Sequence, residues 1–239
     1  MDTSNPLLKR QSAWSVSGAG TSAMTLEGTV NKSGILLLLC LAAAAFSWHE
    51  KELQGVFILA GCLGGFITCM IGLFVPTTTP FTAPIYAVLE GLALGAISQM
   101  TNLRYPGIAT NAFLLTMCVM GLMLFLYATR IIVVTNKLVM GIVIATGAIC
   151  VVYIAELVLG LFGIHMPVLY SSGPIGIGIS LLIVGVAAFN LLIDFAVIEQ
   201  NVRGGAPKYM EWYSGMALLV TLVWLYLEII RLLSKLQRR

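Results

Sequence analysis

The sequence predicts an all-α polytopic membrane protein in which seven transmembrane helices form one bundle. Of its 239 residues, 59% are hydrophobic and only 10% are charged, whereas a soluble domain carries about 25% charged residues. Its apolar runs repeatedly approach the roughly 20 residues that a helix needs to cross a bilayer. So much apolar surface cannot all fold inward, which excludes a soluble enzyme, a nucleic-acid-binding domain and a disordered chain.

The elements follow from these runs, taken in order along the chain. Residues 1–30 are rich in Ser, Gly and Thr and lack a continuous apolar stretch, so we expect a flexible cytoplasmic N-terminal tail without a signal peptide. Residues 31–234 form the predicted seven-helix transmembrane domain, and residues 235–239 a basic C-terminal tail. The predicted spans are 33–48, which is short and recruits residues 29–32, then 54–75, 84–104, 107–128, 138–163, 175–198 and 211–233.

Three segments rich in Pro, Gly and polar residues break the apolar pattern and separate these spans. They are residues 76–84 (PTTTPFTAP), 163–174 (GIHMPVLYSSGP) and 200–208 (QNVRGGAPK). Proline and glycine in such clusters end helices and form loops.

Basic residues in the loops predict that the N-terminus lies in the cytoplasm, because Lys and Arg are enriched on that side. The side of the N-terminus holds Lys9, Arg10, Lys32, Arg130, Lys137, Arg203 and Lys208, whereas the other side, apart from the C-terminal tail, holds Lys51 and Arg104. Seven full spans place the basic C-terminal tail outside, against the rule. The alternative is a re-entrant last segment, and we favour seven full spans.

Two pairs of glycines have the small-xxx-small spacing that lets helix backbones approach closely. They are Gly61 with Gly65, and Gly91 with Gly95. Such a pair forms either a dimer face or an internal helix contact, and here we expect internal contacts.

Four acidic residues fall within the predicted spans: Glu90, Glu156, Asp194 and Glu228. We find no Lys, Arg or His in the middle of a span to neutralise them, and a charged acid at mid-bilayer costs several kcal/mol. They therefore indicate a proton or cation pathway. The alternative for each acid is permanent protonation with a hydrogen bond to a neighbour.

Position along each span places Glu90 and Asp194 toward the cytoplasmic side, and Glu156 and Glu228 toward the other side. At 1.5 Å per residue the two acidic layers are about 15–20 Å apart. Each acid has a polar side chain one or two turns before it, which we expect to support it by hydrogen bonding. These supporting residues are Asn190 before Asp194, Tyr86 before Glu90, Tyr153 before Glu156 and Thr221 before Glu228.

Hard carboxylate oxygens suit Ca²⁺ or protons, so we expect transient Ca²⁺ at most, with no resident metal and no other cofactor. A retinal protein needs a lysine deep in a span, and a membrane haem needs ligands there, but His49 and His165 fall in predicted loops. Without a nucleophile–base arrangement or a known catalytic motif, we expect no enzymatic activity.

Residues 84–98 (PIYAVLEGLALGAIS) and 190–233, which begin NLLIDFAVIEQN, resemble the transmembrane Bax-inhibitor-motif family. The bacterial YccA-like branch is the more similar, and residues 24–36 (MTLEGTVNKSGIL) also resemble it. The resemblance implies a seven-helix bundle with the last helix central, placed in the bacterial inner membrane.

The resemblance also implies a pH-sensitive Ca²⁺ leak, gated by one acid in the sixth helix and one in the seventh. Asp194 matches the first of these. Glu228, in the phrase Leu225-Tyr226-Leu227-Glu228, resembles the second, and Glu211 is an alternative nearer in depth to Asp194. A basic residue that pairs with the sixth-helix acid in some relatives has no counterpart in the second span.

Two functions follow. The first is a passive, pH-dependent pathway for Ca²⁺, or for H⁺ and Ca²⁺, in which Asp194 acts with Glu228, Glu90, Glu156 and Glu211. The second, implied by the resemblance, is a regulatory protein that binds a membrane-anchored AAA protease or another membrane partner through residues 1–32. Neither function involves nucleic acid, and in both the protein is embedded in the lipid bilayer.

Overall fold

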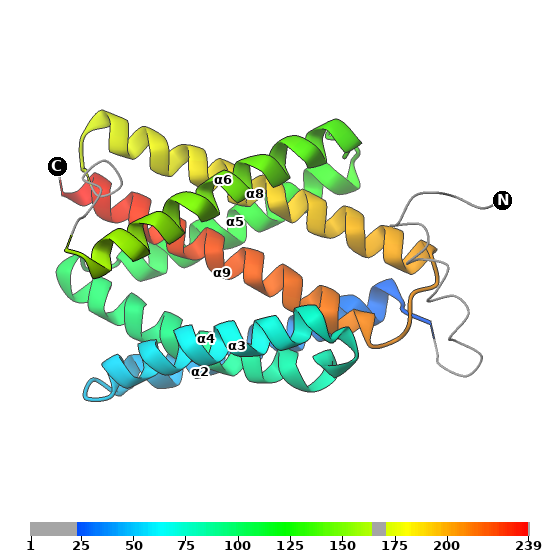
Figure 1. Ribbon diagram of the computed structural model, residues 1–239, viewed down its shortest axis with the longest axis horizontal. Helices are drawn as coiled ribbons and strands as arrows, with labels where there is room; N and C mark the ends of the chain where they lie inside the picture. The colour runs from blue at the N-terminus through cyan, green and yellow to red at the C-terminus, as the bar shows by residue number, and fades with distance from the viewer. Residues whose placement is uncertain (1–22, 164–170, 239) are drawn as a thin grey trace. The chain divides into compact units, whose positions relative to one another are not determined.

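The computed structural model describes residues 23–163 and 171–238, and within these ranges seven helices are long and apolar enough to cross a membrane (Figure 1). They are α2 (Leu26–His49), α3 (Gln54–Phe74), α4 (Thr79–Arg104), α5 (Ile108–Ala128), α6 (Asn136–Leu161), α8 (Pro174–Arg203) and α9 (Met210–Gln237), with a 3-10 turn η1 (Pro76–Thr78) before α4. The only pairing of β type in the described ranges is an isolated bridge between Ala23 and Pro207. The predicted all-α fold with seven spans is confirmed.

The first helix begins earlier than its predicted start. Thr25 caps it, since its hydroxyl accepts a hydrogen bond from the backbone N–H of Gly28 at 3.0 Å. The helix therefore starts at Leu26, inside the predicted tail of residues 1–30. Residues 1–22, where we expect a flexible tail, lie outside the described residues.

Two other helix ends also differ from the predicted bounds. α4 starts at Thr79 and continues through Pro84, which the sequence pattern assigns to a break. Its start is stabilised by the hydroxyl of Thr79, which donates to the carbonyl of Pro76 at 2.7 Å. α9 runs to Gln237, so the predicted C-terminal tail of residues 235–239 begins inside a helix.

The last helix is continuous over its 28 residues. At 1.5 Å per residue it is about 42 Å long, which exceeds the roughly 30 Å hydrocarbon core of a bilayer. A re-entrant segment needs a break in the helix, and α9 has none. The re-entrant alternative is therefore not supported.

The described residues fall into two compact units. Unit 1 contains residues 23–97 and 196–219, and unit 2 contains residues 98–163, 171–195 and 220–238. α8 and α9 contribute to both units. The helix with the largest fraction of buried residues in its apolar segment is α4, followed by α9, and the one with the smallest is α6.

In unit 1, α4 packs against α2 through glycines. A methyl group added to Gly91 or Gly95 would overlap the carbonyl oxygen of Cys40 or of Ala44, respectively. The two helix backbones approach this closely because neither glycine has a side chain.

The second glycine pair lies on α3 and faces α4. A methyl group at Gly61 of α3 would overlap the side chain of Ala93, and one at Gly65 would lie 2.7 Å from a carboxylate oxygen of Glu90. Both small-xxx-small pairs thus serve internal contacts, as predicted.

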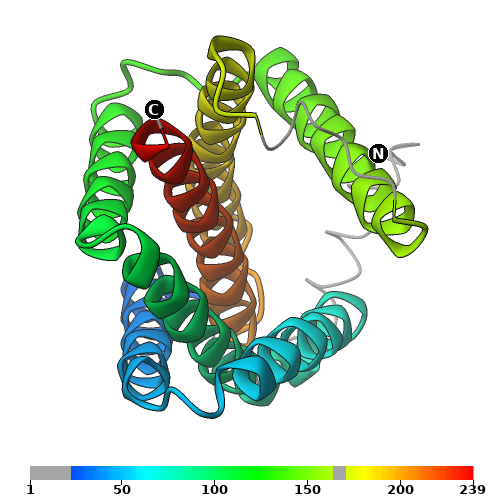
Figure 2. The ribbon, with the colours of Figure 1, turned by 90° about the vertical axis from the view of Figure 1, so that its left-hand side faces the viewer.

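In unit 2, α8 and α9 lie side by side and antiparallel (Figures 1 and 2). Lys235, near the end of α9, donates to the carbonyl of Gly176 at 3.0 Å and to the hydroxyl of Ser180 at 2.7 Å, both near the start of α8. A hydrogen bond of 2.7 Å between the hydroxyls of Ser98 and Tyr226 joins α4 to α9.

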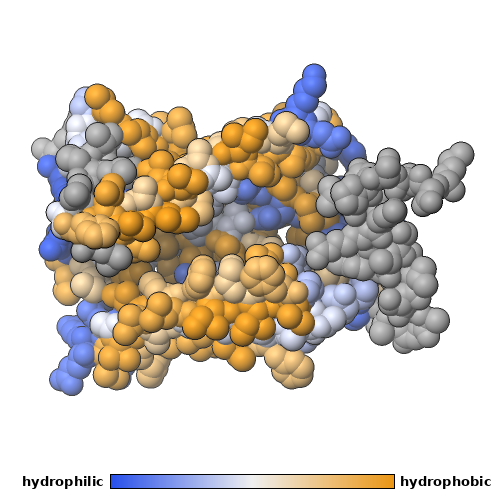
Figure 3. Space-filling model, viewed as in Figure 1, coloured by the Kyte–Doolittle hydropathy of each residue, from blue (hydrophilic) through white to orange (hydrophobic). Residues whose placement is uncertain are grey.

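The helices present large apolar side chains outward, as a membrane protein must. Leu38 of α2, Phe66 of α3, Phe125 of α5 and Leu157 of α6 are all more than half exposed. Figure 3 shows that hydrophobic residues cover much of the visible surface. An apolar surface of this extent is unfavourable in water, whereas the hydrocarbon of a bilayer can cover it.

The close contact of Gly95 with α2 predicts the effect of adding one methyl group. Gly95→Ala should destabilise the protein by about 1–3 kcal/mol, because the backbone of Ala44 cannot yield to the new methyl. Gly121→Ala, at a helical glycine with nothing nearby, is the matched control and should leave the melting temperature unchanged or raise it. Thermal unfolding of the detergent-purified variants measures both, and equal melting temperatures would contradict the proposed packing.

Candidate functional site

Glu90 of α4 lies in unit 1 beside a gap left by a glycine. Its carboxylate faces Gly65 of α3, and the ring of Tyr86 is 3.8 Å from the position of a Cβ at that glycine. Tyr86 therefore lies near Glu90, but in the part of the chain that the structure describes no hydrogen bond joins the two side chains, so the expected support by hydrogen bonding is not formed. Within the described ranges, no basic side chain forms an ion pair with Glu90.

Asp194 of α8 lies in unit 2, where the hydroxyl of Thr221 on α9 is its hydrogen-bonding neighbour. Its Oδ2 atom is buried and has no hydrogen-bond partner among the described residues. The sequence spacing assigns Thr221 to Glu228 instead, and this prediction is wrong because the Thr221 side chain faces α8.

Asn190, the predicted supporting residue of Asp194, turns toward α6. Its amide donates to the hydroxyl of Thr146 at 2.8 Å and to the carbonyl of Val186 at 2.9 Å. The prediction that Asn190 supports Asp194 is therefore wrong, because its donor group is used to join α8 to α6.

Glu228 of α9 is almost fully buried, and it does have a basic partner. The hydroxyl of Tyr153 on α6 donates to its Oε1 at 2.6 Å. Nη1 of Arg231 lies 2.9 Å from Oε1 and 3.1 Å from Oε2. The expectation that no basic side chain neutralises the span acids is wrong for Glu228, because Arg231, three residues later on the same helix, reaches back to it.

Glu156 of α6 is buried in unit 2. Its predicted supporting residue, Tyr153, bonds to Glu228 instead. The spacing along α6 places Tyr153 and Glu156 on neighbouring faces, but packing against α9 decides where the Tyr153 hydroxyl points.

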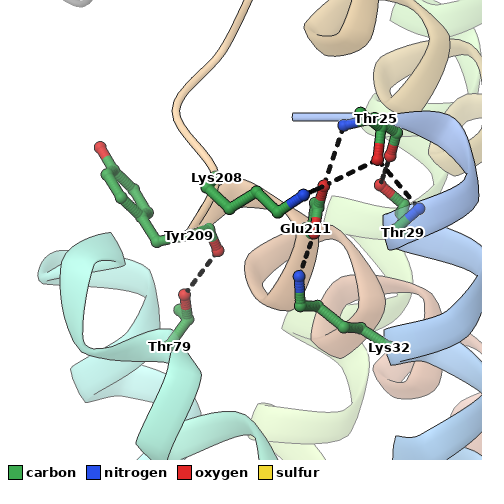
Figure 4. A network of polar contacts seen from close by, with 8 residues as sticks. Thr25, Thr29, Lys32, Thr79, Lys208, Tyr209 and Glu211 are labelled. Carbon is green, nitrogen blue, oxygen red and sulfur yellow. Dashed lines mark hydrogen bonds and ion pairs between the residues drawn. The ribbon is translucent and has the colours of Figure 1, made fainter. Parts of the chain in front are cut away.

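Glu211, the second residue of α9, is fully buried. Figure 4 shows its carboxylate among Thr25, Lys32 and Lys208. Its Oε1 accepts from the backbone N–H of Thr25 at 2.9 Å and from the Thr25 hydroxyl at 3.0 Å. Nζ of Lys208 lies 3.1 Å from Oε1, and Lys32 forms an ion pair with Oε2. Gly28 leaves room for this carboxylate, which any side chain there would overlap.

Two further hydrogen bonds near Glu211 involve backbone groups. The N–H of Met24 donates to the carbonyl of Ala206 at 2.7 Å, and the hydroxyl of Thr79 donates to the carbonyl of Tyr209 at 3.2 Å. We call Glu211 with Thr25, Lys32 and Lys208 the α2–α9 clamp, because it joins the start of α2 to the start of α9. Glu211 is thus neutralised by two lysines, a pairing that the sequence pattern does not indicate.

The two-acid gate implied by the resemblance is not formed by Asp194 and Glu228. Within the described ranges the two carboxyl groups share no hydrogen bond, and each has its own neighbours. Thr221 and Glu228 are seven residues apart on α9, which corresponds to about 10 Å along the helix axis.

Four of the acids divide into two chemical classes. Glu211 and Glu228 are neutralised by cationic side chains, whereas Glu90 and Asp194 have none paired with them in the described residues. In the same residues, no cluster of three or more His, Cys, Asp or Glu side chains could hold a metal ion.

Comparison with known families gave one match. A family model described as "Bax inhibitor 1 like" matches residues 5–238, nearly the whole chain. No curated protein and no solved structure matches the sequence.

The α2–α9 clamp predicts unequal effects of removing its charges. Glu211→Gln should lower the free energy of unfolding by about 3–5 kcal/mol, because it leaves the largely buried ammonium of Lys32 without its counter-charge. Lys208→Gln should cost about 1 kcal/mol or less, because Lys208 is nearly half exposed and Lys32 remains. Thermal unfolding in detergent distinguishes them, and equal losses would contradict the clamp.

Proposed function

The chain belongs to the Bax inhibitor 1-like family, with seven helices fit to span a membrane, and on that premise we propose that it is a passive, pH-dependent pathway for Ca²⁺, or for H⁺ and Ca²⁺. Asp194 is its principal ion-binding residue. The protein acts as a pathway and catalyses no reaction.

The observation that carries this proposal is the buried Oδ2 of Asp194, which has no hydrogen-bond partner among the described residues. An unpartnered carboxylate oxygen away from water is unfavourable by several kcal/mol if it is charged. A proton, a water molecule or a cation satisfies it. Asp194 is therefore suited to exchange such partners.

Competition between a proton and Ca²⁺ for the same oxygen makes the pathway sensitive to pH. Both bind the negatively charged carboxylate, and Ca²⁺ prefers hard oxygen ligands. Thr221 adds a hydroxyl oxygen beside Asp194. In unit 1, Glu90 beside Gly65 is a second carboxylate without a paired cation, and buried Glu156 is a third acid of the proposed pathway.

We further propose that the protein resides in the bacterial inner membrane with its N-terminus in the cytoplasm. The clamp brings the starts of α2 and α9 to one end of unit 1, where Lys32 and Lys208 lie. Basic residues gathered at one end of a membrane protein favour the cytoplasmic side.

The alternative function, regulation of a membrane-anchored AAA protease, relies on residues 1–32 as an interaction segment. Residues 26–32 belong to α2, and Thr25 and Lys32 are bound in the clamp. This part of the segment is therefore held in the fold, and residues 1–22 lie outside the described ranges.

Uptake of ⁴⁵Ca²⁺ into proteoliposomes of the purified protein tests the proposed function. Wild-type uptake should vary with pH, and Asp194→Asn should reduce it several-fold and flatten its pH profile, because Asn does not titrate. The matched control is Glu50→Gln, an acid-to-amide change at an exposed residue, which should behave as wild type.

Two outcomes would count against the proposal. Uptake no higher than that of empty liposomes at every pH would reject the ion pathway and favour the regulatory alternative. Unchanged uptake in Asp194→Asn would remove Asp194 from the mechanism.

A further inference from the structure

Glu228 is enclosed by two side chains that supply all its side-chain hydrogen bonds and ion pairs in unit 2. The phenol of Tyr153 holds Oε1, and the guanidinium of Arg231 holds both oxygens. The Arg231 guanidinium also lies over the Tyr153 ring, 5.0 Å from its centroid. A diffusible cation therefore meets no free oxygen at Glu228.

Arg231 is the group between this carboxylate and the exterior. The side chain of Glu228 is 2% exposed, whereas that of Arg231 is 39% exposed. The guanidinium is thus anchored at its inner edge and free at its outer edge. A side chain in that position can swing outward without disturbing the helices.

The pair contributes little to holding helices together. Glu228 and Arg231 are three residues apart on α9, so their ion pair lies within one helix and joins no two helices. The connection from α9 to α6 comes from the Tyr153 hydroxyl. What Arg231 supplies is a positive charge on a buried carboxylate.

The next basic residue on α9 does not share this role. The ammonium of Lys235 is buried and donates to Gly176 and Ser180 of α8. Both of those acceptors are neutral. Among the described residues, Arg231 is therefore the cation that forms an ion pair with Glu228.

We propose that Arg231 is a built-in counter-ion that occupies Glu228 and must swing away before a diffusible cation can bind there. This inference rests on the proposed ion pathway and adds Glu228 to its acids. Tyr153 keeps its hydrogen bond to Glu228 when Arg231 leaves, so the carboxylate stays in place to receive the cation. Arg231 is thus a positioning residue that controls access to Glu228.

Binding of Tb³⁺, a Ca²⁺ substitute whose luminescence is excited by nearby Tyr and Trp, tests this without requiring flux. The detergent-purified Arg231→Gln variant should gain a Tb³⁺ signal several-fold above wild type. Arg231→Lys, which keeps the charge, should remain close to wild type. The gain should disappear in the Arg231→Gln, Glu228→Gln double variant, because the carboxylate that binds Tb³⁺ is gone.

A second variant covers the case in which Arg231→Gln does not fold. Tyr153→Phe keeps both charges but removes the hydroxyl that accepts a hydrogen bond from Arg231 and donates one to Glu228. It should give a smaller gain in Tb³⁺ signal, which again disappears when Glu228→Gln is added. The counter-ion role is overturned if neither folded variant gains signal, or if the gain persists without Glu228.

Uptake of ⁴⁵Ca²⁺ by the same variants separates this inference from the proposed function. Arg231→Gln should raise uptake several-fold in a manner that requires Glu228. If uptake depends on Asp194 but Arg231→Gln changes neither uptake nor Tb³⁺ binding, the counter-ion role fails and the pathway stands. If Arg231→Gln gains Tb³⁺ binding at Glu228 but no variant takes up Ca²⁺, the counter-ion role stands and the pathway fails.

Discussion

A carboxylate among apolar helices has to be matched inside the protein, because neither lipid nor apolar side chains can solvate its charge. Glu211 is matched by two lysines and by Thr25, and Glu228 by Arg231 and Tyr153. Asp194 is matched only in part, by a hydroxyl. Glu211 thereby joins two helices, Glu228 carries a counter-ion from its own helix, and Asp194 keeps an oxygen that can take a proton or a cation, which is the property on which the proposed function depends.

The helices were predictable because bilayer thickness sets the length of an apolar run, and the glycine pairs were predictable because close backbone contacts need small residues. The exact ends of the helices were less predictable. α2 starts at Leu26 because the Thr25 hydroxyl caps it, and α9 continues to Gln237 because Lys235 finds acceptors on α8. Both ends depend on specific polar contacts, which the apolar character of a segment does not reveal.

The acids themselves could be found from the sequence, since charged residues are rare in spans, but most of their partners could not. Spacing along one helix shows which residues share a face, and it does not show which helix packs on that face. Tyr153 and Thr221 therefore hydrogen-bond to acids other than those expected, and Asn190 hydrogen-bonds to Thr146 instead of an acid. The three-residue spacing of Glu228 and Arg231 is visible in the sequence, but spacing alone does not show that the Arg231 side chain reaches back to the acid.

The α2–α9 clamp also constrains how the protein is made. Glu211 follows Lys32 by 179 residues and Thr25 by 186, so the first helix enters the membrane long before its partner has been synthesised. Until then Lys32 must be solvated by water or lipid headgroups at the membrane surface. The contacts of α2 with α4 can form early, whereas those with α9 form only after α9 has been inserted, so the start of α2 is fixed late in synthesis.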